Sequence, residues 1–124
     1  MGPNTGTTIE LLNHTDRVAS MAWSAYGRLA AAGADGAVRV WDPTNGATTE
    51  LPSHTSRLRS MAWSAAGHLA TGEAGVVRVW DVTERRVLTA FTVDGYATSC
   101  AWSRDGEALA VAGSWGLHLL QLIE

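Results

Sequence analysis

Short apolar stretches follow one another along almost the whole chain, separated by turn-forming residues such as Gly, Asp, Asn and Pro. Strands at regular short spacing with turn signals between them are typical of all-β proteins. No window shows the apolar stripe of an amphipathic helix. We therefore expect an all-β chain, with strands over residues 18–24, 29–33, 38–41, 48–51, 58–64, 69–72, 76–80, 87–91, 98–103, 108–112 and 117–120, and one more over 7–12.

The strand pattern is an internal repeat. The segment 20–25, Ser-Met-Ala-Trp-Ser-Ala, returns unchanged as residues 60–65, and Val-Arg-Val-Trp-Asp at 38–42 returns at 77–81. A third, more divergent copy has Ala-Trp-Ser at 101–103 and Leu-His-Leu-Leu-Gln at 117–121. A period of roughly forty residues indicates a repeat architecture built from one supersecondary unit.

The three copies together resemble WD40 repeats, over roughly residues 7–121. The family pattern combines a His-containing turn, an aromatic-Ser-x-x-Gly segment, an Asp-Gly turn and a terminal Trp-Asp, as at His14, residues 23–27, 35–36 and 41–42. The resemblance implies a β-propeller with four-stranded radial blades. We expect a single domain over 7–121, with blade equivalents of about 7–47, 48–86 and 87–121, and a flexible N-terminus over 1–6.

In the WD40 family, a His, a Ser or Thr, an Asp and the Trp form a buried hydrogen-bonded relay within each blade. The resemblance assigns His14, Asp35 and Trp41 to it in the first copy, with Ala31 in place of the hydroxyl. The second copy offers His54, Thr71 and Trp80, but Glu73-Ala74 replaces the Asp turn; the third has Val93, Leu120 and Gln121 at the relay positions. Because no copy is complete, we expect blades weaker than those of the family.

Composition excludes several function classes. The net charge is −3 without a basic cluster, which argues against nucleic acid, and no apolar run approaches membrane-spanning length. The single cysteine, Cys100, and the N-terminus without secretory features favour a cytoplasmic protein. Neither a metal-ligand spacing nor a phosphate-binding motif occurs, so we expect no metal and no cofactor. The His, Ser and Asp of a repeat could suggest a hydrolase, but the relay is buried and structural, so we expect no enzymatic activity.

Five of the six tryptophans recur at repeat positions and are predicted to lie in the blade core: Trp23, Trp41, Trp63, Trp80 and Trp102. We expect Trp23 and Trp63 to be equivalent and equally buried. Cys100 aligns with Met21 and Met61 and should also be a core residue. Trp115 instead occupies the turn position of Asp35-Gly36, and packing on a neighbouring segment or on a partner are both open alternatives.

The candidate binding residues follow the His turn, where strands of a propeller enter beside the central channel. Arg17, Arg57 and Tyr96 are aligned there, Asp16 precedes Arg17, and Arg59 lies two positions beyond Arg57. Arg and Tyr are frequent hot-spot residues of protein interfaces. The alternative is a solvated rim that binds nothing tightly.

The resemblance implies a non-enzymatic scaffold that binds a protein or peptide. The alternative is a structural fragment of a longer propeller, such as the sensor arm of a bacterial signalling ATPase or kinase, without activity of its own. An enzyme ranks last. Fold does not determine which of these functions applies.

Three blade equivalents fall short of the four to eight blades of a typical propeller. They would leave two flat apolar blade faces exposed, which soluble proteins seldom tolerate. We therefore expect head-to-tail association, giving a six-bladed homodimer or, as the second choice, a nine-bladed homotrimer. The strand at 7–12 would complete the third blade of the neighbouring copy.

Overall fold

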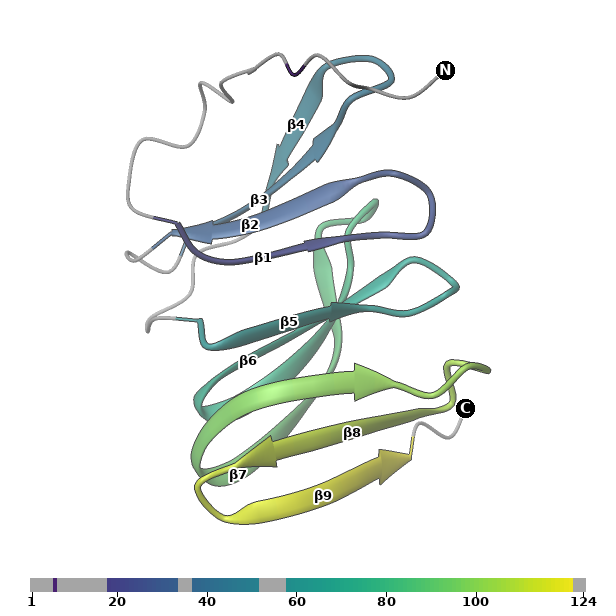
Figure 1. Cartoon of the computed structure of the whole chain (residues 1–124). Coiled ribbons are helices and arrows are strands. Elements are labelled where there is room, and N and C mark those ends of the chain that lie inside the picture. Colours follow the sequence, from purple (N-terminus) through teal and green to yellow (C-terminus); the bar gives the residue numbers. More distant parts are fainter. Residues whose placement is uncertain (1–5, 7–17, 34–36, 52–57, 122–124) are drawn as a thin grey trace.

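The computed structural model describes residue 6 and residues 18–33, 37–51 and 58–121, which contain nine β-strands and no helix. Hydrogen-bonded neighbours are antiparallel, as expected for an all-β chain (Figure 1). The expected strand at 7–12 lies outside the described residues. The strands are β1 (Val18–Trp23), β2 (Leu29–Gly33), β3 (Val38–Asp42), β4 (Ala47–Glu50), β5 (Ser60–Trp63), β6 (His68–Asp81), β7 (Arg86–Trp102), β8 (Ala108–Gly113) and β9 (Gly116–Gln121).

The long strand β6 contains the two predicted strands 69–72 and 76–80, and it folds back on itself. Its first half pairs with β5, and its second half pairs with β7. The indole N–H of Trp80 donates to the Thr71 hydroxyl at 3.1 Å. In a straight strand, residues nine positions apart would lie about 30 Å from each other, so this bond requires a sharp bend. Gly75, with φ +83°, supplies the left-handed conformation there.

Strand β7 bends in the same way. Residues 86–92 pair with β6, residues 97–102 pair with β8, and Gly95 adopts φ +85° between them. Three sheets result, which follow one another from top to bottom in Figure 1. We call them blades 1, 2 and 3: blade 1 is β1–β4, blade 2 is β5, β6 and the first half of β7, and blade 3 is the second half of β7 with β8 and β9.

The Trp-Ser-x-x-Gly segment forms the same turn in each of the three copies. The Ser24 hydroxyl accepts the Arg28 N–H at 2.9 Å, and Ser64 and Ser103 accept the N–H groups of His68 and Ala108 at 3.0 and 3.1 Å. The glycine of each turn has positive φ, between 75° and 93°. Local backbone chemistry thus explains the repeated motif. The serine hydroxyl accepts a backbone N–H at the end of the turn, and the glycine supplies the positive φ with which the chain reverses direction.

The apolar core lies between blades rather than within them. One buried cluster combines blade 1 residues such as Val38 and Val40 with blade 2 residues such as Leu58 and Leu69. A second combines Val77 and Val79 of blade 2 with Ala97 and Leu109 of blade 3. Since these are equivalent repeat positions, one packing arrangement is used twice. Hydrophobic burial between neighbouring sheets is therefore what joins the repeats.

The prediction that Trp23 and Trp63 are equally buried is wrong. Trp63 packs against the first cluster, whereas Trp23 is 61% exposed. Trp80 is buried, and Trp41, Trp63 and Trp102 are half-buried. Cys100 is also half-buried and packs against the second cluster. The difference has a simple cause: Trp63 faces blade 1, but no described residue covers the corresponding face of blade 1.

The three blades lie side by side without forming a closed ring (Figure 1). Within the described ranges, no helix is long and apolar enough to cross a bilayer.

Candidate functional site

The bends of β6 and β7, the β8–β9 turn and the start of β5 meet at one edge of blades 2 and 3. Ala74 pairs with Tyr96, and Ser114 donates its N–H to the Tyr96 carbonyl at 3.2 Å. Arg59 donates its N–H to the Gly72 carbonyl at 2.7 Å. These bonds bring Arg59, Tyr96 and Trp115, three of the predicted binding residues, into one region that we call the rim.

An exposed cation–π pair forms the outer part of the rim. The Arg59 guanidinium carbon lies 4.1 Å from the centroid of the Tyr96 ring, and both residues are exposed. The backbone N–H of Tyr96 donates to the Ser114 hydroxyl at 3.1 Å, which fixes the strand that carries the ring. The stacking holds a charged group over an aromatic face and leaves guanidinium donors facing solvent.

Trp115 lies in the β8–β9 turn and packs inward. Its ring meets His118 edge-on, with centroids 4.3 Å apart and planes at 68°, and it contacts the second cluster. Its indole N–H is buried without an acceptor among the described residues. Trp115 lies beside the bend at Gly95, where an added Cβ would lie 3.3 Å from its Cδ1 and closer still to the Ser114 hydroxyl.

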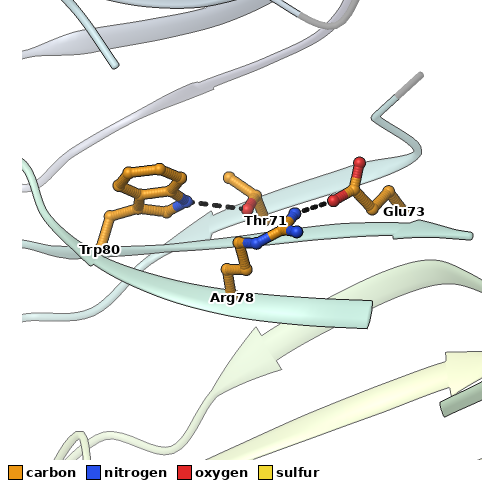
Figure 2. Close-up of polar contacts among 4 residues, drawn as sticks. All are labelled: Thr71, Glu73, Arg78 and Trp80. Atoms are coloured by element: carbon orange, nitrogen blue, oxygen red, sulfur yellow. Dashed lines mark hydrogen bonds and ion pairs between the residues drawn. The ribbon is translucent and has the colours of Figure 1, made fainter. Parts of the chain in front are cut away.

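The part of the relay that the structure describes is the Thr71–Trp80 bond, which is completely buried (Figure 2). Trp41, the counterpart of Trp80 in blade 1, is half-buried, and Ala31 stands at the repeat position of Thr71. The remaining predicted relay residues, His14, Asp35 and His54, lie outside the described residues. So do the predicted rim residues Asp16, Arg17 and Arg57.

Glu73, which replaces the Asp turn of the family, forms an ion pair that the sequence reading did not predict. Its buried carboxylate accepts from the guanidinium of Arg78, five residues on (Figure 2). The pair spans the bend of β6 beside the Thr71–Trp80 bond. In blade 1, the counterpart of Arg78 is Arg39, whose Nε lies 3.7 Å from Oε1 of the exposed Glu50. The bend brings Glu73 and Arg78 together, and no spacing rule for a straight strand would do so.

A second feature missed at the sequence level is an open groove of about 910 Å³ between the outer parts of blades 2 and 3. Its lining mixes apolar and polar side chains, including Phe91, His68 and Glu107. Nearby Asp105 accepts hydrogen bonds from the Ser103 hydroxyl and the Glu107 N–H, which lower the pKa of its carboxyl. No group of three or more metal-ligating side chains gathers in the described part of the chain.

Cys100 has no features of a reactive thiol. Burial raises the pKa of its thiol, and its contact with the Ser60 hydroxyl at 3.6 Å opposes that shift only in part. The Ser60 hydroxyl itself donates to the Ala97 carbonyl at 3.0 Å and so joins β5 to β7. A buried thiol with a raised pKa is a poor nucleophile.

Comparison with known structures agrees with this architecture. The chain is similar to the crystal structure of the β-propeller domain of Cps50 (Swd1) from Myceliophteria thermophila, with a TM-score of 0.76 and 19% identity. The match covers 90% of this chain and 37% of that chain, so this chain spans about a third of the length of that propeller domain. The likeness shows the fold alone. No curated protein sequence matches the chain.

The family model described as WD domain, G-beta repeat matches residues 6–42 and 46–81. These ranges cover more than half of the chain and correspond to the two well-preserved copies. The third copy, which lacks the terminal Trp-Asp, falls outside them but forms blade 3 in the same register. The shared motif, the repeated turn and the propeller-like arrangement of blades lead to one conclusion: the chain belongs to the WD40 repeat family.

Proposed function

We propose that this protein is a non-catalytic scaffold that binds a protein or peptide segment at the rim. The observation that carries the proposal is the exposed stack of Arg59 on Tyr96. Arg and Tyr dominate the energetics of many protein interfaces, and here both are held in place by neighbouring backbone bonds. A preorganised pair loses little side-chain entropy on binding.

The chemistry of the pair favours a ligand with a carboxylate. The guanidinium carries several N–H donors in a rigid plane that suits the two oxygens of a carboxylate, and stacking on Tyr96 fixes that plane. Tyr96 is 45% exposed as a residue and offers apolar contact beside the charge. An acidic residue next to an apolar one in an extended peptide would satisfy both groups.

Peptides selected against the immobilised chain from a random display library test this proposal. The double variant Arg59→Ala/Tyr96→Ala should weaken their binding at least about tenfold in fluorescence anisotropy. The control variant Tyr26→Ala/Arg104→Ala removes the same two residue types from exposed Trp-Ser-x-x-Gly turns, outside the rim. It should leave the affinity for the selected peptides unchanged. Selected peptides that bind the rim double variant as tightly as the parent, or a library that yields no binders, would contradict the proposal.

A second candidate is a structural part of a larger propeller with no independent binding activity. The observation in its favour is the share of the matched propeller domain that this chain spans, 37%. The two candidates differ in the peptide selection, since a purely structural unit yields no rim-dependent ligand. Closure of the ring by identical copies is a further proposal, which rests on the blade faces.

A further inference from the structure

One hydrogen bond recurs at both contacts between blades. The indole N–H of Trp63 donates to the Ala22 carbonyl at 3.0 Å, and that of Trp102 donates to the Ala62 carbonyl at 2.9 Å. The two acceptors are equivalent alanines: Ala22 pairs with Ala30, and Ala62 pairs with Ala70. Each blade thus joins the preceding one through the tryptophan of its first strand.

Blade 1 presents the donor side of this contact, and no blade formed by the described residues covers it. Its Val18, Met21 and Trp23 are exposed, Met21 by 67%. The equivalent residues Leu58 and Ala97 are buried in blades 2 and 3, and Met61, Cys100, Trp63 and Trp102 pack against the two clusters. At these repeat positions, the same or similar residue types are therefore buried where another blade precedes the strand and exposed where none of the described blades does. We call this surface the leading face.

Blade 3 presents the acceptor side. Leu117 and Leu119 of β9 are 75% and 62% exposed, whereas their counterparts Val38, Val40, Val77 and Val79 are buried beneath the next blade. Ala101, the counterpart of Ala22 and Ala62, is exposed and pairs with Ala110 in the same register. We call this surface the trailing face. It has the apolar pattern that a leading face covers.

We propose that the leading face of one copy docks on the trailing face of a second copy, with the Trp23 indole N–H donating to the Ala101 carbonyl. The argument for a second copy as occupant is continuity with the two contacts inside the chain, because both halves of the same interface are present on its two faces. Such head-to-tail contacts form rings when the rotation closes. The inference goes beyond the proposed rim function and rests on different residues.

Sedimentation velocity of the purified 124-residue chain over a range of micromolar concentrations tests the proposal. The parent should associate, and Trp23→Ala on the leading face or Ala101→Asp on the trailing face should each weaken association at least about tenfold. Both positions are exposed, so circular dichroism should show the fold unchanged. Leu88→Asp, at an exposed apolar position of blade 2, is the matched control and should associate like the parent.

An equimolar mixture of the two face variants makes the test specific. The Ala101→Asp copy keeps an intact leading face and the Trp23→Ala copy keeps an intact trailing face, so one good contact remains and a 1:1 heterodimer should form. If the leading face docked on the leading face of another copy instead, Ala101→Asp would associate like the parent. A parent chain that stays monomeric throughout, face variants that associate like the parent, or a mixture that remains monomeric would each overturn the proposal. Loss of association would leave rim-directed peptide binding intact, so the two proposals fail separately.

Discussion

At the scale of single residues, the structure shows how a divergent repeat keeps its blade together. In blade 2, the Thr71–Trp80 bond and the Glu73–Arg78 pair both span the bend in β6 (Figure 2). Blade 1 has Ala31 where Thr71 stands. Polar groups buried with their partners stabilise a blade, whereas a partner removed alone leaves an unsatisfied group.

The variant Thr71→Val should lower the free energy of unfolding by about 1–3 kcal/mol, because the buried Trp80 N–H loses its acceptor. Adding Trp80→Phe removes the orphaned donor, so the double variant should lose less than the sum of the single variants. Urea denaturation of the four proteins measures this coupling. Strict additivity would mean that the hydroxyl and the indole do not interact.

The two equivalent arginines allow a matched comparison. Arg78→Leu removes the guanidinium that pairs with the buried Glu73 carboxylate and should cost up to about 3 kcal/mol, since Arg78 itself is partly exposed. Arg39→Leu breaks only an exposed pair with Glu50 and should cost less than about 1 kcal/mol. Denaturation midpoints compare the two variants. Equal losses would show that Glu73 is not dependent on Arg78.

The half-buried thiol of Cys100 predicts a pH dependence of stability. Its pKa is raised above the ordinary value of 9.0, so the native state holds this proton more tightly than the unfolded state. Its contribution to stability is fully present below pH 9.0 and is lost as pH rises through the raised pKa. Cys100→Ser should flatten that part of the stability profile. Rapid alkylation of Cys100 by iodoacetamide in the folded protein at pH 8 would contradict the assigned burial.

At the scale of the elements, identical sequence segments have different surroundings. The segments 20–25 and 60–65 are the same, yet β1 exposes its tryptophan and β5 packs its own against blade 1. Trp63→Ala should therefore cost about 3–5 kcal/mol through lost burial and a cavity. Trp23→Ala should cost less than about 1 kcal/mol in a dilute, unassociated sample, as for most exposed positions. Equal losses of stability in the two variants would mean that β1 and β5 are packed against equivalent neighbours, which would contradict the structure.

Turn chemistry and period were sufficient to predict, from the sequence, the strands found among the described residues. The Ser and Gly of each aromatic-Ser-x-x-Gly segment have local roles, so their meaning is visible in the chain itself. The exposure of Trp23 was not predictable in this way, because burial depends on which blade precedes a strand. The Arg59–Tyr96 stack and the Glu73–Arg78 pair join residues across bends and between strands, and neither follows from spacing.

At the scale of the whole molecule, three blades are joined by two copies of one interface. Each copy combines an apolar cluster with a Trp-to-Ala hydrogen bond. The same donor and acceptor recur on the leading and trailing faces. The stability of such an array is approximately the sum of the stabilities of its units and the free energies of their nearest-neighbour contacts. The interface between blades is therefore central to the stability of the molecule.

Hydrogen exchange of the indole N–H groups, followed by NMR and assigned with single Trp→Phe variants, tests that feature most directly. The indole N–H groups of Trp63 and Trp102 donate to partly buried interblade acceptors and should exchange only when the blades separate. In a dilute, unassociated sample, Trp23 should exchange near the rate of a free indole, since it is 61% exposed. Protected Trp63 and Trp102 beside an unprotected Trp23 are the predicted result. Exchange of all three at the same rate would contradict the repeated interface.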